Sequence, residues 1–486
     1  MAIKSYTSVA NSNVSLFPEN MAPSSVNDSA RQVQADIRSW YTDSEWSDFG
    51  DAGISRASAT TFKITGDVTG RYLAERRLKC YDSTTTLYAT IVSSSYSDPD
   101  TTITVELDND TSLTASLTAV ALASISPSNS SLSPEVRVGK NVLFGCDFSM
   151  NPWQRGTTFT TVASGTYTAD MMIWNQSGVG VVDVLKTAEA PTVSQAKVLT
   201  SHCFHVDCTT VDASIAAADY YFCGYKVEGY DFSVIAQMSM TLSFWVKSTK
   251  TGIFCVAVQN SGGNRSYISE YTVNTTNTWE KKTITITASP STGDWNYTNG
   301  IGLLIYFSLA IGSNYHTTAN AWQASSYLAT SNQVNGLDSI ANDFKLALIK
   351  LESGGVATPW EKENEQQVLA KCQRYYFKTF NQGVTPAAAG ADYAGCLAYN
   401  AQVAGVSQSG VLLSFPVTMR ATPSFTFYNP GASGTAWRNI TDGANSGASN
   451  YTSSYGMRGV QVTNDQAAGD GVTETLAIHM DAIATL

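Results

Sequence analysis

The segment His202–Cys208 contains the densest group of reactive side chains in the sequence, with two histidines, two cysteines and an aspartate. On an extended strand, Cys203, His205 and Asp207 would share one face, as three ligands of a zinc ion would need to. No second group of ligands at zinc-finger spacing accompanies them, and residues of one strand rarely converge on a single ion without help from elsewhere. We therefore expect a β-strand with buried cysteines here, and no metal site.

Motifs that carry catalysis or bind a cofactor are missing from the sequence. It has no phosphate-binding GK[ST] loop, no G-x-S-x-G elbow and no HExxH pair, and its four histidines suggest no catalytic triad. A carboxylate pair for glycoside hydrolysis would be invisible in a sequence, because its members need only meet in space. We expect no catalytic residue and no cofactor, and hence a binding protein.

Aromatic residues in polar loops offer a different chemistry, the recognition of sugars. A pyranose ring has an apolar face and a polar rim, so an exposed Trp or Tyr beside amide, carboxylate or Arg groups is suited to hold it. Trp295, in the segment GDWNYTNG, and Trp322 are candidates for such a platform. The alternative is that both have a structural role, because tryptophan is usually part of a core.

A second aromatic segment, Tyr428–Gly459, is rich in Gly, Ser and Asn and reads as a loop. Rigid aromatic side chains on adaptable polar loops are typical of antibody-like binding surfaces. The segment is interpreted either as a flexible loop with packing aromatics or as a receptor-contacting tip. Its candidate contact residues are Tyr428, Trp437, Arg438, Tyr451 and Tyr455.

Length and charge narrow the class of protein. At ~100–200 residues per domain, 486 residues predict three or four domains. Only 14% of the residues are charged, and 29 basic against 40 acidic residues leave a net charge of −11. No basic run is present, which argues against nucleic acid as a partner.

The most apolar stretch, Gly300–Gly312, is shorter than the ~20 residues needed to cross a bilayer, so we expect no membrane insertion.

Short period-2 runs separated by turn residues predict a mainly β protein built of tandem antiparallel domains. Residues 49–135 predict a small β barrel or sandwich and a linker, and residues 136–362 predict a jelly-roll sandwich. Residues 363–486 predict a connecting helix followed by a C-terminal β domain, and residues 1–48 form a separate N-terminal segment.

Two helices are expected to join these domains to their surroundings. Residues 28–41 predict an amphipathic helix whose apolar stripe must pack on a neighbouring domain or on a partner protein; the stripe is Val33, Ile37, Trp40 and Tyr41. Thr358, Pro359 and Glu361 form a capping-box signature, which predicts a connecting helix of about four turns.

Three stretches resemble bacteriophage virion proteins, in the order usual for that family. The segment Phe17–Tyr41 resembles the N-terminus of tail-fibre proteins. MNPWQRGTTF, YTADMMIW and the closing DFKLALIKLESGGVATPWE resemble a carbohydrate-binding-module-like jelly roll of phage tail proteins. LAKCQRYYFKTF and FPVTMRATPSFTFYN resemble the β domain that often follows it. Met171–Trp174 depart from the Asp-Arg-Trp usual in the family.

The resemblance implies a tail fibre or spike, a homotrimer made in the host cytoplasm and located in the virion. Its N-terminus would bind the tail or another virion protein, and its C-terminus a bacterial surface glycan or receptor. Two alternatives stay open: an architectural collar, adaptor or head fibre without receptor contact, and a polysaccharide depolymerase.

Overall fold

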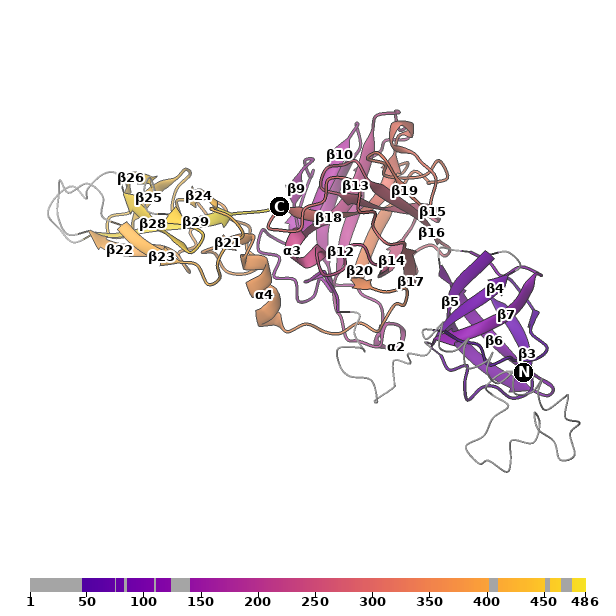
Figure 1. Cartoon of the computed structure of the whole chain (residues 1–486). Helices are drawn as coiled ribbons and strands as arrows, with labels where there is room; N and C mark the ends of the chain where they lie inside the picture. Colours follow the sequence, from indigo (N-terminus) through magenta and orange to yellow (C-terminus); the bar gives the residue numbers. More distant parts are fainter. Residues whose placement is uncertain are drawn as a thin grey trace, which may run out of the picture. The chain divides into compact units, whose positions relative to one another are not determined.

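The structure is a computed structural model that describes residues 46–74, 76–82, 85–108, 111–123, 140–401, 410–450, 455–464 and 474–486 (Figure 1). The predicted fold class is confirmed, since the chain is mainly β and every sheet is antiparallel in its strand pairs within these ranges. The predicted helix at 28–41, with Val33, Ile37, Trp40 and Tyr41, lies outside the described residues.

The chain divides into two compact units. The first consists of Met1–Gly139 and Thr283–Thr285, and the second of Lys140–Lys282 and Ile286–Leu486. The division that the sequence predicted after residue 362 falls inside the second unit. Each unit is described by itself below.

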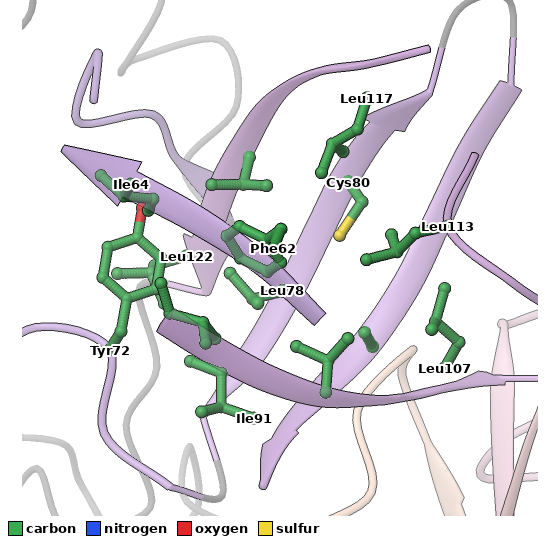
Figure 2. Close-up of a cluster of buried hydrophobic side chains, with 14 of the residues drawn as sticks. Phe62, Ile64, Tyr72, Leu78, Cys80, Ile91, Leu107, Leu113, Leu117 and Leu122 are labelled. Atoms are coloured by element: carbon green, nitrogen blue, oxygen red, sulfur yellow. The ribbon is translucent and has the colours of Figure 1, made fainter. Parts of the chain in front are cut away.

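The first unit contains one seven-stranded antiparallel sheet with the strand order β1-β7-β4-β5-β6-β3-β2. The strands are β1 (Trp46–Ser47), β2 (Ser55–Arg56), β3 (Thr61–Thr65), β4 (Arg77–Asp82), β5 (Thr85–Ser97), β6 (Asp100–Leu107) and β7 (Leu117–Ala123). Strand β6 shows why these residues form a sheet, because Ile103, Val105 and Leu107 are buried and Thr104 and Glu106 between them are not. The apolar side chains of several strands gather in one core (Figure 2).

A buried ion pair lies beside this core. Arg77 on β4 and Asp108 at the end of β6 are 1% and 5% exposed, and Arg77 Nη1 donates to Asp108 Oδ1 at 2.7 Å. The second guanidinium nitrogen contacts the other carboxylate oxygen, so the pair is bidentate. It fixes the end of β6 to β4.

The first part of the second unit is a sandwich of two antiparallel sheets. A seven-stranded sheet has the order β19-β16-β15-β18-β13-β10-β9 and a six-stranded sheet the order β17-β14-β20-β12-β11-β8. The first comprises β9 (Thr166–Tyr167), β10 (Met172–Ser177), β13 (Tyr220–Glu228), β15 (Gly252–Asn260), β16 (Ser266–Val273), β18 (Ile301–Ile311) and β19 (Trp322–Gln323). The second comprises β8 (Thr158–Phe159), β11 (Val181–Thr187), β12 (Cys203–Thr210), β14 (Met240–Ser248), β17 (Glu280–Ile286) and β20 (Asp343–Ser353).

Aromatic side chains from both sheets fill the space between them. Phe244 of β14 meets Phe307 of β18 edge-on, with the ring centroids 5.0 Å apart. Phe254 of β15 and Phe344 of β20 lie 5.5 Å apart. These contacts place the core of the sandwich between the sheets and leave the binding chemistry to loops and outer faces. Three short helical segments interrupt the strands: α2 (Val193–Ala196), α3 (Gly229–Phe232) and the 3₁₀ turn η4 (Ser313–Tyr315).

The connecting helix is shorter than predicted and begins later. Helix α4 spans Glu365–Gln373 and is capped by Asn364, whose side chain accepts a hydrogen bond from the backbone N–H of Gln366. The predicted cap at Thr358 is therefore wrong. The Thr358 hydroxyl instead donates to the buried carboxylate of Glu352 on β20, at 2.5 Å, and so serves the sandwich.

The C-terminal part of the second unit is a nine-stranded antiparallel sheet. Its main order is β21-β29-β25-β26-β28-β23, with β22 and β24 paired to β29 and β27 paired to β28. The strands are β21 (Tyr376–Lys378), β22 (Leu397–Ala401), β23 (Gly410–Ser414), β24 (Ser424–Tyr428), β25 (Ala436–Asn439), β26 (Asn445–Asn450), β27 (Tyr455–Gly456), β28 (Gly459–Asn464) and β29 (Glu474–Ile483). Strand β29 pairs with four described strands along its length, which makes it the central strand of this sheet.

All eight cysteines are free thiols, and seven of them are buried. Within the described ranges, no helix has the length and apolar character needed to span a membrane.

Candidate functional site

Trp295 and Trp322 lie side by side on the sandwich, although 27 positions separate them in the sequence. Their rings meet edge to face, with centroids 5.7 Å apart and planes at 76°. Trp322 is placed by β19, where it pairs with Tyr267 of β16. Trp295 belongs to the loop between β17 and β18. Both indoles are half-buried, so each retains an exposed part.

The two indoles are held in fixed orientations. Trp295 Nε1 donates to the carbonyl of Thr292 at 3.1 Å, and Trp322 Nε1 donates to the carbonyl of Thr287 at 3.0 Å. With their N–H groups satisfied by backbone, the rings lose little freedom when a ligand arrives.

The buried ring of Phe232 in α3 supports this surface from below. Trp295 stacks on it at 5.2 Å, and Tyr297 stacks on it at 5.9 Å with the planes 9° apart. Tyr297 is 38% exposed. We call Trp295, Tyr297 and Trp322 together the aromatic ledge.

Polar groups adjoin the ledge at Asp294. Asn264, in the turn between β15 and β16, donates from Nδ2 to Asp294 Oδ2 at 2.8 Å and accepts the backbone N–H of Asp294 at 3.1 Å. Arg265 Nη2 donates to the hydroxyl of Thr292 at 3.0 Å. Asp294 is exposed, and its second carboxylate oxygen has no hydrogen-bond partner among the described residues.

The two loops must approach closely to form this arrangement. A Cβ on Gly293, which has φ +109°, would lie 2.7 Å from the Arg265 side chain, and a Cβ on Gly262 would lie 2.4 Å from that of Asp294. Glycine is therefore required at both positions. The result is a firm surface that combines aromatic rings, a carboxylate, an amide and a guanidinium, the groups that a sugar ring requires.

The sequence identified Trp295 and Trp322 as candidates, but it missed Asn264, Arg265 and Asp294 as their polar neighbours. Glycines flank both turns, at Gly262–Gly263 and Gly293, and these were the only local signal that the backbone segments meet.

The predicted tip at Tyr428–Gly459 is not a single loop. It contains β25, β26 and β27, all paired into the C-terminal sheet. Trp437 on β25 is fully buried in the core of this sheet, where its Nε1 donates to the carbonyl of Thr463 at 3.2 Å. The prediction of Trp437 as a receptor contact is therefore wrong, because no part of its ring reaches the surface.

The other tip candidates that the structure describes make contacts within the C-terminal sheet. The Tyr428 hydroxyl is directed to the buried carboxylate of Asp481, at 2.9 Å. Arg438 is half-buried, and its Nη1 donates to Asn445 at 3.2 Å. Tyr455 is 46% exposed and packs edge-on against Phe425. Tyr451 lies outside the described residues.

Residues Cys203–Cys208 of the reactive segment lie in β12 (Cys203–Thr210), as the sequence predicted. His205 Nδ1 bonds to the hydroxyl of Thr187 at 3.0 Å, and Nε2 lies 3.7 Å from Asp343. Burial and the neighbouring Lys345 lower the pKa of His205 to about 4, so its imidazole is neutral at pH 7 and the contact with Asp343 is not an ion pair. Among the described residues, no three His, Cys, Asp or Glu side chains are grouped so as to hold a metal ion.

No protein-family model matches this chain, and no curated protein is significantly similar to it in sequence. Several solved structures show a weak likeness. The enzymatically active domain of tailspike protein 4 of bacteriophage CBA120 is 13% identical, with a TM-score of 0.23, over 40% of this chain and 22% of that one.

Two carbohydrate-binding modules of Clostridium thermocellum give similar values. A family 11 module, solved with a β-1,3-1,4-linked tetrasaccharide, is 11% identical, with a TM-score of 0.22, over 42% of this chain and 99% of that one. The C-terminal family 22 module of Xyn10B is 11% identical, with a TM-score of 0.22, over 38% and 88%. TM-scores this low define no fold family, so the function is inferred from the side chains.

Proposed function

We propose that this protein binds a glycan without cleaving it, and that the aromatic ledge is its principal sugar-binding surface. The observation that carries the proposal is the fixed contact between Trp295 and Trp322 beside the exposed carboxylate of Asp294. The apolar C–H face of a pyranose would lie on the aromatic surface, since the C–H groups are attracted to the negative face of a π system. Its hydroxyls would bond to Asp294 and to the amide of Asn264.

The wider role that we propose is host attachment by a bacteriophage tail fibre or spike. The sequence resemblance of the N-terminal, jelly-roll and C-terminal segments supports this role. In this proposal the protein is a homotrimer of the virion, made in the host cytoplasm, with an N-terminal contact to another virion protein. An architectural collar or adaptor would carry the same domains but would bind no bacterial glycan, and a depolymerase would release reducing ends.

Direct binding measurements test the ledge. Purified protein is screened on an array of bacterial surface polysaccharides, and a positive glycan is then titrated by calorimetry. Truncating a tryptophan at a binding hot spot costs about 2 kcal/mol or more, so Trp295→Ala and Trp322→Ala should each weaken binding about 30-fold. Tyr96→Ala, at an exposed tyrosine of the first unit, is the matched control and should leave affinity unchanged.

Three outcomes would contradict parts of the proposal. Full affinity in the Trp295→Ala/Trp322→Ala double variant together with a loss in Tyr455→Ala would move the site to the C-terminal sheet. Release of reducing ends from the bound polysaccharide would make the protein a depolymerase. A solution mass near 52.1 kDa, and not three times that value, would remove the trimer.

A further inference from the structure

A cavity of about 230 Å³ opens at the end of the sandwich where the segment before β8 meets β11 and helix α4. The residues that matter for its chemistry are Trp153, Thr157, Lys186, Glu365 and Leu369. None of them belongs to the aromatic ledge. The volume is below the ~300–1,000 Å³ of pockets for drug-sized ligands, so it suits one small molecule and not a chain of sugars.

Lys186 stands on the inner face of β11. It follows the fully buried Val182 and Val184 at the two-residue period of a strand, so it points to the same side of the sheet. Its backbone N–H donates to the carbonyl of Thr157 at 2.8 Å, and its register partner is Phe204 on β12. Phe204 stacks on Trp153, which also lines the cavity. The lysine is thus built into the cavity wall.

The charge of Lys186 is not neutralised inside the described part of the chain, where it forms no salt bridge and its side chain donates no hydrogen bond. Burial lowers the pKa of Lys186, and the carboxylate of Asp147 acts against this effect. Asp147 itself accepts the backbone N–H of Met150 at 2.8 Å and is not within ion-pair distance of Lys186. A partly desolvated, unpaired cation destabilises a fold, and natural proteins carry such costs mainly at functional sites.

Other groups of the cavity are also available to a ligand. The hydroxyl of Thr157 and the carboxylate of Glu365, in the first turn of α4, have no hydrogen-bond partner among the described residues. Leu369, one turn further along α4, adds an apolar wall. The groups that the cavity offers therefore include the cation of Lys186, the hydroxyl of Thr157, the carboxylate of Glu365 and apolar surface.

We infer that this cavity binds a single acidic sugar residue of the hexuronate class, with the ammonium group of Lys186 paired to the sugar carboxylate. The ring hydroxyls would donate to Glu365 and bond to Thr157, and the apolar ring face would pack on Leu369. The site is separate from the aromatic ledge and does not rest on the function proposed for it. It would allow the protein to distinguish a single acidic sugar from a neutral one.

The test uses the full chain and free monosaccharides. Galacturonate and glucuronate are titrated against the wild type by ligand-observed NMR, with galactose, glucose and acetate as separate arms. We expect a uronate to bind at least tenfold more tightly than the neutral sugars and acetate, and Lys186→Gln to remove this difference. Lys197→Gln, at an exposed lysine outside the cavity, is the control and should bind like the wild type.

A stability measurement keeps the result interpretable. Because Lys186 is unpaired, Lys186→Gln should leave the unfolding temperature unchanged or raise it, whereas a lysine with a structural role would lower it. The inference is overturned if neither uronate is preferred over the neutral sugars and acetate, or if Lys186→Gln keeps the preference. Such a result leaves glycan binding at the ledge untouched, since Trp295→Ala reports on that site alone.

Discussion

Arg155 lies flat against Tyr376, with its guanidinium carbon 3.9 Å from the centre of the ring. The same guanidinium donates from Nη1 to the buried carboxylate of Asp170 at 3.0 Å. The preceding Gln154 donates from Nε2 to the backbone carbonyl of Tyr376 at 2.9 Å. The NPWQRG motif therefore joins the start of the sandwich to β21 of the C-terminal sheet within the second unit. This gives a structural role to a motif that the sequence singled out only by resemblance.

Arg155→Met should destabilise the second unit by about 3 kcal/mol or more, because it leaves Asp170, 2% exposed, as a buried charge without its cation. Burial already raises the pKa of Asp170 against the effect of Arg155. Urea unfolding followed by tryptophan fluorescence measures the change. The exposed Arg458→Met is the matched control and should stay within about 0.5 kcal/mol of the wild type. Equal losses in the two variants would show that the contact stabilises nothing.

In the first unit, Arg77→Met should cost about 3–5 kcal/mol, since Asp108 would remain buried without its bidentate partner. Replacing both residues, as in Arg77→Met with Asp108→Leu, should recover most of this loss, because apolar side chains in place of a buried pair are often neutral in stability. Amide hydrogen exchange of β4 and β6 in the full chain localises the effect. A double variant with a lower free energy of unfolding than Arg77→Met alone would contradict this account.

His205 should make the protein less stable in mild acid. Its pKa is about 4 in the folded chain against 6.5 for an ordinary histidine. Between these values the unfolded chain takes up a proton that the folded chain does not, so stability falls as the pH falls from 6.5 to 4. His205→Gln should flatten the dependence of unfolding temperature on pH in this window. Parallel curves for the variant and the wild type would refute the assignment.

Substitutions of Trp437 and Tyr455 should differ in their effect on the stability of the C-terminal sheet, because the first residue is buried and the second is exposed. Trp437→Ala empties a fully buried site and should cost about 3–5 kcal/mol. Tyr455→Ala removes a side chain that is 46% exposed and packs edge-on against Phe425, so it should cost only about 1 kcal/mol. Chemical denaturation of both variants provides the comparison. A loss in Tyr455→Ala as large as that in Trp437→Ala would contradict this account.

Elements governed by local sequence were predicted well. The period-2 runs that predict strands include β6, where the apolar side chains of Ile103, Val105 and Leu107 alternate with more polar ones and lie on the buried face. The capping signature at Thr358 predicted the wrong helix start because a contact outside the local pattern decides what this residue does. The Thr358 hydroxyl donates a hydrogen bond to the carboxylate of Glu352, which is buried on β20, and does not cap a helix. The helix-capping pattern in the sequence does not show that these two residues meet.

The mainly β character of this chain could be predicted from its amino-acid order, because alternation and turn residues act over a few positions, and its low charge follows from its composition. The sequence also identified tryptophans as candidate binding residues, but it did not show which of them are buried. Only the tertiary structure buried Trp437 and brought Trp295 to Trp322, since exposure depends on which distant segment packs over a ring. The same is true of Lys186, whose unpaired charge becomes visible only when β11, α4 and the segment before β8 enclose it.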